Sequence, residues 1–497
     1  MKLQRYIAVS SILLMSVALA SHAQSVYEAG SAANQTLNGT ARFLGSGGAL
    51  NAIGGDVSTI SYNPAGLGVY STDELTLTLN THWTNTRFGQ QPRESWPYAA
   101  INNAAYVKTM TTGHETGLKS WNMAFTYNSV QSFKRRGSYI GNSNSSMADF
   151  LAAYSTGLTA DDMSYENENT GWASVLAYDA HLISPDGDGW KSNVSENENA
   201  NSFSLNESSI NNEFALSFGW NFNNKVFAGV SFVGHYLDYN LYSSYTEEYS
   251  DNLLGNTRSY QAHGAGFTGK IGIIYKPSKW VRLGAAFHTP GIYLYNDKVA
   301  TSFRNNDSIY SSPYYDTFFR SRLQTPLKAS ASIGIHLGKY GIFGLDYQFT
   351  NFQNTRVGRD KTAAINSKTG IYLRDQHVIR GGFEIRPIDW FSLRIGAGYY
   401  SPYTSQNMAD ALLYNDTDTE IGYYTDGGSY SINCGIGFKF NIQYLDFAYV
   451  YQAHHGTYHP YSTDFANEWG GSHAADEICL PLRTINNQIL ITYGLKF

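Results

Sequence analysis

The stretch LKASASIGIHLGKYGIFGLDYQFTNF, residues 327–352, alternates apolar and polar side chains on both sides of a short link. Every odd-numbered residue is apolar in 327–337 and again in 343–349. Alternation with a period of two is typical of a β-strand that has one apolar face. Because the link at 338–341 is short enough for a tight turn, the stretch predicts two antiparallel strands. Soluble β-sandwiches alternate in the same way, so this pair alone leaves the class of sheet open.

The spacing of such segments along the whole chain separates the two classes of sheet. We count about fourteen segments, an even number as in bacterial outer-membrane barrels. They lie near 74–84, 99–109, 119–130, 210–222, 225–238, 262–276, 280–295, 326–338, 341–353, 375–387, 389–400, 429–440, 442–453 and 484–497. Their connections alternate between short ones, such as 221–225 and 386–390, and long ones, such as 131–209 and 401–428. This alternation of short and long connections predicts an all-β protein, a transmembrane antiparallel β-barrel with short turns at one end and long loops at the other.

The composition is that of a large, charge-poor β protein. Charged residues make up 15% of the 497 residues, against about 25% in an ordinary globular domain. A disordered chain would be poor in aromatic residues, whereas this one has 39 Tyr and 26 Phe. After residue 20 no apolar run reaches the roughly 18 residues that a spanning helix needs. The net charge of -6 offers no basic surface, so a nucleic-acid partner is excluded as well.

The first residues have the pattern of a secretory signal peptide. Lys2 and Arg5 precede an apolar run at 7–20, and small residues follow at 21–23. We therefore expect cleavage before Gln24. The predicted domains are a signal peptide at 1–23, a plug at 24–72, and a barrel at 73–497 whose outer loop 131–209 is partly helical. The expected location is the outer membrane of a Gram-negative bacterium.

The plug prediction depends on the inward-facing positions of the predicted strands. These positions carry charges such as Arg282, Glu384, Arg394 and Asp446, which an empty apolar lumen would not tolerate. Residues 24–72 are glycine-rich and lack strand alternation, so we expect them to fill the lumen. Short helices are predicted near 28–36, 46–54 and 64–67. The glycines between 45 and 55 do not precede a β-α-β unit, so close packing against a barrel wall explains them better than a nucleotide loop.

The plug is also where the sequence resembles a known family. The run from Gly39 to Leu50, followed by the run from Ser61 to Leu67, resembles the plug of the FadL/TodX family of outer-membrane transporters. The triplet Asn63-Pro64-Ala65 is the most specific of these marks, and the segments 284–290 and 325–326 are similar too. Members of this family transport long-chain fatty acids and aromatic hydrocarbons. The resemblance implies a plugged barrel that captures a hydrophobic molecule outside, holds it above the plug and releases it through a gap in the wall.

The resemblance and the loop pattern together suggest candidate substrate-binding residues. In the plug we expect the ligand to pass near Phe43, Leu44 and the triplet Asn63, Pro64 and Ala65. In the loop 131–209, one predicted amphipathic helix begins after Ser146 and a weaker one begins at Trp172. Their candidate contacts are Phe150, Leu151, Tyr154, Leu158 and Trp172. These apolar faces either capture the ligand or pack on each other as a lid, and the sequence leaves both interpretations open.

Other chemistry has weaker support. The last outer loop gathers four histidines, at 454, 455, 459 and 473, but Gly456 and Pro460 argue against the helix that a metal pair at 455 and 459 would need. We therefore expect no metal, no cofactor and no catalytic residues, and we do not predict an enzyme. The alternatives are a porin-like channel, a receptor for haem or another hydrophobic ligand, and an outer-membrane lipase.

The expected partners follow from the predicted location. They are outer-membrane lipid and lipopolysaccharide, a hydrophobic small-molecule substrate and, during insertion, the barrel-assembly machinery. The last of these is expected because the chain ends in Phe497 on the lipid-facing phase, a terminal signature of outer-membrane barrels. We expect the barrel to be a monomer.

Overall fold

The computed structural model describes residues 24–497 except 168–169, 195–197, 317, 319–320, 359–363, 407, 409–416, 418 and 462–477. The predicted signal peptide at 1–23 lies outside the described residues. Among the described residues, no helix is both long enough and apolar enough to cross a membrane.

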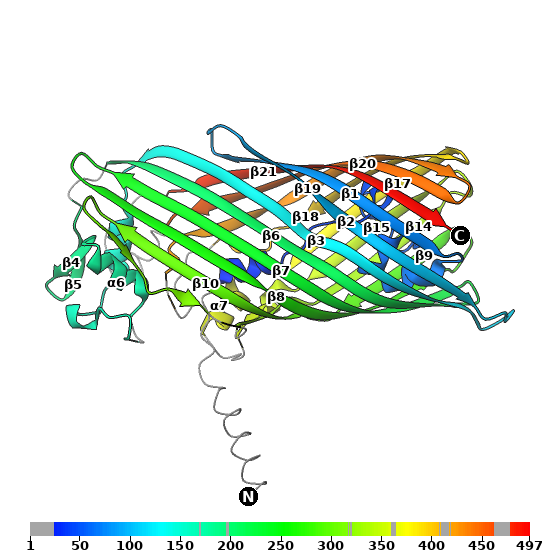
Figure 1. Cartoon of the computed structure of the whole chain (residues 1–497), viewed down its shortest axis with the longest axis horizontal. Coiled ribbons are helices and arrows are strands. Elements are labelled where there is room, and N and C mark those ends of the chain that lie inside the picture. The colour runs from blue at the N-terminus through cyan, green and yellow to red at the C-terminus, as the bar shows by residue number, and fades with distance from the viewer. Residues whose placement is uncertain are drawn as a thin grey trace, which may run out of the picture.

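The wall is a closed antiparallel barrel of fourteen strands, as the sequence predicts (Figure 1). Several wall strands are interrupted and carry two labels. The strands are β1 (Glu74–Phe88), β2 (Glu94–Thr111), β3 (Leu118–Ser143), β6 (Asn199–Phe222), β7 (Val226–Glu248), β8 (Leu253–Tyr275), β9 (Val281–His288) with β10 (Ile292–Arg304), β14 (Lys328–His336) with β13 (Ser321–Gln324), β15 (Gly341–Thr350) with β16 (Arg356–Val357), β17 (Gln376–Ile388), β18 (Phe391–Tyr400), β19 (Tyr423–Phe440), β20 (Gln443–His459) and β21 (Leu480–Lys496). The barrel closes where β1 pairs with β21, from Glu74 opposite Lys496 to Phe88 opposite Leu482.

Two Thr-Pro pairs interrupt neighbouring wall strands, so the predicted strand 280–295 is two pieces instead of one. A proline cannot donate a ladder hydrogen bond. At the first break, Thr289 donates its amide to the Gly269 carbonyl at 2.9 Å, and its Oγ1 accepts from the Gly269 amide at 3.0 Å. Thr325 makes the same pair of bonds with Gly291, at 2.9 and 3.0 Å. The threonine hydroxyls thus take over ladder hydrogen bonds at the breaks.

Several strands continue far beyond their predicted ends. Residues 131–143 and 199–209, predicted as outer loop, belong to β3 and β6, and β7 and β8 leave only a short connection between 248 and 253. The prediction stopped where outward-facing apolar residues stopped. Beyond that level the outward face is polar, because it no longer meets lipid, while the strands still pair.

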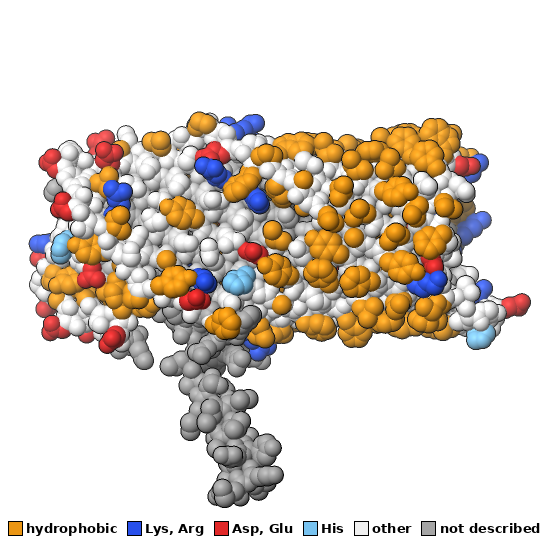
Figure 2. All heavy atoms as spheres, in the orientation of Figure 1, with side chains coloured by type: hydrophobic (Ala, Val, Ile, Leu, Met, Phe, Trp, Pro, Cys, Tyr) orange, Lys and Arg blue, Asp and Glu red, His pale blue; other side chains and the backbone are white. Residues whose placement is uncertain are grey.

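An apolar band surrounds the end of the barrel that carries the short turns. Figure 2 shows hydrophobic side chains gathered over this half, the end at which the C-terminus lies, with charged and polar atoms over the other half. Exposed large apolar residues of the band include Leu79, Phe125, Phe232, Ile271 and Ile395. A barrel with such a band is suited to a bilayer, because its closed sheet leaves no backbone edge in lipid.

The remaining elements lie inside the barrel or at its outer end. In the plug (residues 24–70) these are α2 (Val26–Ala33), α3 (Ala41–Gly45), α4 (Val57–Tyr62) and the 3-10 helix η1 (Pro64–Val69). Outside it are α5 (Met147–Tyr154), η2 (Ala160–Asp162), α6 (Trp172–Asp179), η3 (Phe352–Asn354), α7 (Ala364–Tyr372), the hairpin β4 (Ile183–Asp186) and β5 (Gly189–Ser192), and the short strands β11 (Ile309–Ser311) and β12 (Tyr315–Asp316). The plug residues are almost all buried.

The helix predicted at 46–54 is wrong, and the reason is glycine. Gly47, Gly48, Gly54 and Gly55 all have φ between +67° and +73°, in the left-handed region that ends helices. The plug therefore turns here, and α3 and α4 lie on either side of the turns. A Cβ on Gly47 would lie 2.7 Å from the carbonyl oxygen of Gly381 in the wall. The expected close packing against the wall is confirmed for Gly45 and Gly47, whereas Gly48, Gly54 and Gly55 face other plug residues.

The wall also carries glycines where it meets the plug. Each wall strand from β6 to β19 has one inward-facing glycine at plug level: Gly219, Gly229, Gly272, Gly284, Gly334, Gly344, Gly382, Gly396 and Gly435. A Cβ on any of them would collide with the plug or crowd it; on Gly219, for example, it would lie 2.6 Å from the amide nitrogen of Gly68. We call this row the glycine girdle. It lets the plug backbone approach the wall without intervening side chains.

The strands β20, β21, β1, β2 and β3 complete the circle without belonging to the girdle, and here polar side chains hold the plug. Asn122 Nδ2 donates to the carbonyls of Leu67 and Tyr70 at 2.7 and 3.1 Å. Asn102 Nδ2 donates to the Gly39 carbonyl at 2.6 Å, and Thr492 Oγ1 accepts from the Ala41 amide at 2.8 Å. We call this part the polar wall.

Candidate ligand site

The outer end of the barrel is covered by the helices predicted in the loop 131–209. α5 begins after Ser146, whose Oγ accepts from the Ala148 amide at 3.1 Å, so the predicted cap is confirmed. Phe150 and Leu151 are buried in one large apolar cluster with α6 and the outer barrel strands. Tyr154 and Trp172 are half-buried, and Leu158 lies beyond the end of α5. The apolar stripe is therefore occupied by packing, which favours the lid over an open capture groove.

A buried carboxylate fixes the start of α5. Glu247 of β7 accepts the Met147 amide at 2.6 Å, the Ser146 hydroxyl at 2.7 Å and the Tyr249 hydroxyl at 2.9 Å. Burial raises the pKa of Glu247, and these three donors act in the opposite direction. The lid is thus attached to the wall by hydrogen bonds at the helix N-terminus, where an acceptor is favoured.

One stretch of the wall lacks strand pairing. β2 pairs with β1 up to Glu94, but it pairs with β3 only from Asn103 to Thr111. β3 continues to Ser143 and pairs there with β6 alone. We call the unpaired edges, 94–102 of β2 and 129–143 of β3, the seam. The seam begins at the outer edge of the apolar band, because Ser132 is in register with Ile210, a residue whose side chain is 37% exposed.

Side chains and the plug replace part of the missing ladder. The Tyr98 hydroxyl donates to the Ser132 carbonyl at 2.8 Å, and Lys134 Nζ lies 5.2 Å from the centre of the Trp96 ring. On the inner side, the Thr36 amide of the plug donates to the Val130 carbonyl at 3.0 Å. The side-chain contacts across the seam can break when single side chains rotate. Opening a β-ladder would instead require a row of backbone hydrogen bonds to break.

A cavity of about 80 Å³ lies directly behind the seam. We call it the seam cavity. The plug residues Ser31, Asn34 and Thr36 contribute to it, and the wall contributes Thr84, Gln131, Phe133, Arg135, Tyr403, Tyr424, Asp426, His454, Thr484 and Asn486. Three of these, Gln131, Phe133 and Arg135, come from the unpaired edge of β3. The residues Asn34 and Thr36 also border a smaller cavity of about 20 Å³ between the plug and β19.

The charged groups around the seam cavity are already matched by protein partners. Arg135 is paired with the buried Glu207, which also accepts the hydroxyls of Tyr27 and Tyr239 at 3.1 and 2.9 Å. Asp426 accepts the amides of Tyr403 and Gly428 at 3.1 and 3.2 Å. Burial raises the pKa of Asp426 to about 6 and lowers that of His454 to about 4. At neutral pH His454 is therefore uncharged.

A second cavity, of about 30 Å³, lies deeper, between the plug and the wall near the Thr-Pro breaks. Lys270 donates to Glu213 at 2.5 Å and to the Ser61 carbonyl at 2.9 Å, and Arg380 faces Asp346 across the β15–β17 ladder. Lys328 Nζ bonds to Gln35 Oε1 and has no carboxylate within ion-pair distance among the described residues. A ligand carboxylate would therefore meet one cation here that lacks a partner acid.

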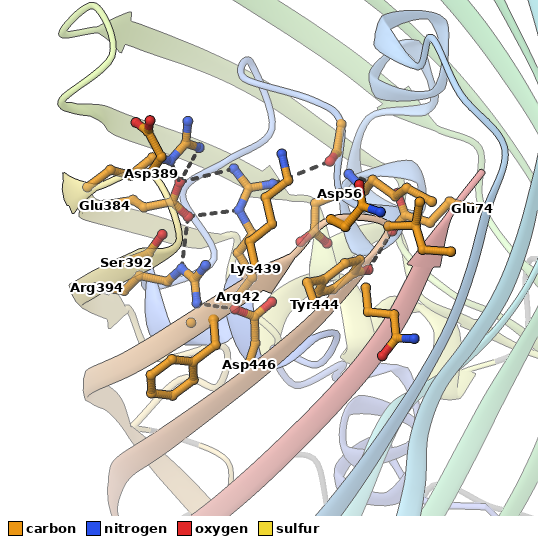
Figure 3. Close-up of a pocket in the computed structure, with 18 residues that line it drawn as sticks. Arg42, Asp56, Glu74, Glu384, Asp389, Ser392, Arg394, Lys439, Tyr444 and Asp446 are labelled. Atoms are coloured by element: carbon orange, nitrogen blue, oxygen red, sulfur yellow. Dashed lines mark hydrogen bonds and ion pairs between the residues drawn. The ribbon is translucent and has the colours of Figure 1, made fainter.

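A third cavity, of about 210 Å³, lies at the short-turn end, and charged groups of both signs line it (Figure 3). Arg42 of α3 points from the plug toward Glu384, to which its Nε donates at 2.8 Å. Arg394 bridges Glu384 at 2.8 Å and Asp446 at 2.6 Å. The predicted inward charges are thus confirmed here as an ion-pair network that fixes the plug to the wall.

The plug residues predicted to contact substrate are buried, either within the plug or between the plug and the wall. Phe43 and Leu44 are fully buried, and Phe43 stacks on Tyr62 at 5.0 Å between ring centres. Asn63 Oδ1 accepts the Ala65 amide at 3.0 Å, and the triplet packs on Gly229 and Gly272 of the girdle. None of Phe43, Leu44, Asn63, Pro64 and Ala65 lines a cavity described above. Their role in substrate passage stays a prediction.

The histidines predicted on the last outer loop are partly on a strand. His454, His455 and His459 belong to β20, which ends at His459, and His473 lies outside the described residues. The described residues contain no group of three or more His, Cys, Asp and Glu placed to hold a metal ion.

The seam and its cavity were missed by sequence reasoning. Alternation in β2 continues through the seam, whereas in β3 it breaks between 128 and 135, where the predicted strand 119–130 ends. One available signal was the doublet Asn102-Asn103, because both amides are buried and Asn102 forms a bulge opposite β1, directly before the seam.

Comparisons with known proteins identify the fold. No family model and no curated protein matches the sequence. Among solved structures, a FadL homologue of Pseudomonas aeruginosa is similar, with a TM-score of 0.55 and 11% identity over 93% of this chain and 99% of that chain. The toluene transporter TodX of Pseudomonas putida is similar with a TM-score of 0.51 and 13% identity, and the same shares of both chains are covered. The chain thus has the fold of these two barrels.

Proposed function

We propose that this chain is an outer-membrane transporter of the FadL/TodX type that moves a small hydrophobic or amphipathic molecule across the outer leaflet. The observation that carries the proposal is the position of the seam cavity. It lies above the main body of the plug and directly behind the one part of the wall, in the described residues, where neighbouring strands separate side by side. The fold shared with the toluene transporter TodX supports this assignment.

In the proposed route the molecule passes the lid of α5 and α6, enters the seam cavity and leaves sideways through the seam. Passage straight down the barrel is blocked because the plug backbone touches the glycine girdle. A sideways exit at the outer edge of the apolar band delivers the molecule to the hydrocarbon phase, where an apolar solute is favoured. In this route the plug keeps its shape through the predicted residues Phe43, Leu44, Asn63, Pro64 and Ala65. We propose no catalytic residue in this chain.

The test closes the seam chemically. Cysteines at Tyr98 and Ser132 are bridged by a short bis-maleimide in cells that carry the chain, and uptake of labelled fatty acids, aromatic compounds and small sugars is measured. Dependence of the apolar probes on the chain, with loss of their uptake on bridging, is the expected result. The control pair, Tyr106→Cys with Phe125→Cys, bridges strands that are already paired and should leave uptake unchanged. Sideways exit is refuted if bridging the seam has no effect.

A porin-like channel is the second candidate, and the charged cavity at the short-turn end favours it. Removing residues 25–70 should raise single-channel conductance sharply if the plug blocks the lumen. If the intact chain already conducts, and only sugars depend on it in the uptake test, the channel replaces the transporter. In either case we propose a monomer that contacts lipopolysaccharide outside and is inserted by the barrel-assembly machinery.

A further inference from the structure

The lining of the seam cavity is mixed. Phe133, Tyr403 and Tyr424 give it aromatic surface, as a hydrophobic cargo requires. The adjoining surface, on β1 and β21, is polar and is formed by Thr84, Thr484 and Asn486. Thr84 and Asn486 face each other across the β1–β21 ladder. A path built only for hydrocarbon would not need this polar surface.

The polar surface has hydrogen-bonding capacity that the protein does not use. Thr84 Oγ1, Thr484 Oγ1 and Asn486 Oδ1 are buried atoms that make no hydrogen bond of good geometry among the described residues, and only Asn486 has a polar contact there, with the side chain of His82. Thr84 is only 2% exposed and Asn486 only 7%. Buried polar groups in proteins are nearly always hydrogen-bonded, and leaving one without a partner costs free energy. Three such atoms on one wall of one cavity indicate a place for a group that donates and accepts hydrogen bonds.

Charge and size limit what that group can be. Arg135 is bound by Glu207, and Asp426 accepts two backbone amides, so a ligand meets no free cation here. The neighbouring carboxylate of Asp426 disfavours an anion. The cavity of about 80 Å³ is smaller than the roughly 150 Å³ that hold a benzene molecule, so it takes a head group of a few atoms.

We propose that the seam cavity binds the neutral, oxygen-bearing end of an amphipathic ligand, and that the chain prefers alcohols or phenols to the matching hydrocarbons. This inference rests on the proposed function, because it names the substrate class of the same route. The hydroxyl bonds to Thr84, Thr484 and Asn486, while the apolar part lies against Phe133 and the two tyrosines. Because the cavity holds only a few atoms, the plug residues Asn34 and Thr36 that line it would have to shift to admit the ring of such a ligand.

The test compares benzyl alcohol with toluene. Equilibrium dialysis with the purified full chain should show benzyl alcohol binding about tenfold more tightly, as expected for one or two net hydrogen bonds. Thr84→Val with Asn486→Leu should reduce this ratio to about one by weakening the alcohol only. Since Thr84 Oγ1 has no partner among the described residues and Asn486 interacts only with His82, the variant should fold, which heat-modifiable migration on a gel checks. Thr84→Val alone serves as the milder variant, because it leaves the neighbour of His82 in place. The control is Thr126→Val, which removes another buried hydroxyl without a protein partner from β3, outside the cavity.

The outcomes separate this inference from the proposed function. Equal binding of the two probes by the unchanged chain, or a ratio that survives in both variants, overturns the preference for oxygenated ligands. In that case uptake of toluene by cells that carry the chain still supports the transporter. If uptake of neither probe depends on the chain, the transporter itself is refuted.

Discussion

The glycine girdle and the polar wall hold the same plug in different ways. From β6 to β19 each wall strand carries a glycine where the plug backbone lies against the wall backbone. From β20 through β21 and β1 to β3 the wall keeps side chains, and amides and hydroxyls such as those of Asn122 and Thr492 bond to plug backbone groups. The girdle itself therefore acts by shape, with polar contacts such as Arg42–Glu384 and Lys270–Ser61 beside it, whereas the polar wall acts by hydrogen bonds alone among the contacts described above.

The difference matters because the seam and its cavity lie on the polar wall. Hydrogen bonds can be exchanged for bonds to water or ligand at small net cost, about 1 kcal/mol each. Backbone surfaces in direct contact cannot be rearranged without moving the whole plug. We infer that the girdle is the fixed support and the polar wall the side on which plug and strands can separate.

The largest effect is expected from adding a side chain to the girdle. In Gly344→Val the new Cβ would collide with the Ala49 carbonyl, a backbone atom that cannot rotate away. Overpacking of this kind should destabilise plug seating by about 3 kcal/mol and raise single-channel conductance. Gly234→Val is the control, because a Cβ there meets nothing closer than the Phe214 carbonyl at 3.9 Å. Unchanged conductance in Gly344→Val would show that the girdle does not seat the plug.

A smaller effect is expected on the polar wall. Asn122→Ala removes the bonds to the Leu67 and Tyr70 carbonyls and should destabilise the end of the plug by about 2 kcal/mol. Hydrogen exchange of the amides in η1 should become faster, while those in α3, which packs on β18 to β21, keep their rates. Equally faster exchange throughout the plug would mean that its two ends are not held independently.

The smallest effect concerns pH at the seam cavity. Because burial raises the pKa of Asp426 from 3.8 to about 6, its contribution favours the folded state below pH 4 and is lost as the pH rises through 6. Asp426→Asn should therefore stabilise the outer barrel by about 1–2 kcal/mol at pH 7.5 and have little effect at pH 4. Thermal unfolding at both pH values measures this. A gain of the same size at both would exclude ionisation of Asp426 as its cause.

The fold was predictable because a barrel wall that faces lipid needs an apolar residue at every second position of each strand, and this pattern is visible in the sequence. Alternation and turn parity located all fourteen strands, including the pair around 338–341. What escaped prediction lies where the lipid constraint ends. Outside the band, outward residues such as Ser204 and Asn206 are polar. Residues 199–209 of β6 were therefore predicted as a loop, although they continue to pair with β7.

The site was less predictable than the fold for a different reason. Ser146 and the stripe of α5 were visible because helix caps and amphipathic faces are local signals. The seam is defined by the strands that do not pair, and pairing is not a local property of the sequence. The polar surface of the cavity joins Thr84 and Asn486, which are far apart along the chain. The inward glycines stood in the alternation pattern, but only contact with the plug shows why their side chains are missing.

The order of the girdle along the chain has a consequence for assembly. Its glycines run from Gly219 to Gly435 on consecutive strands, while the closing pair β1–β21 belongs to the polar wall. A backbone that fits this closely has no clearance to slide into a finished cylinder. We therefore expect the plug to settle on the open sheet first, with the two ends of the chain joining over it last. Arg42→Cys on the plug and Glu384→Cys on β17 replace side chains that already meet, so a short bis-maleimide should bridge them before the barrel acquires its heat-resistant migration on a gel.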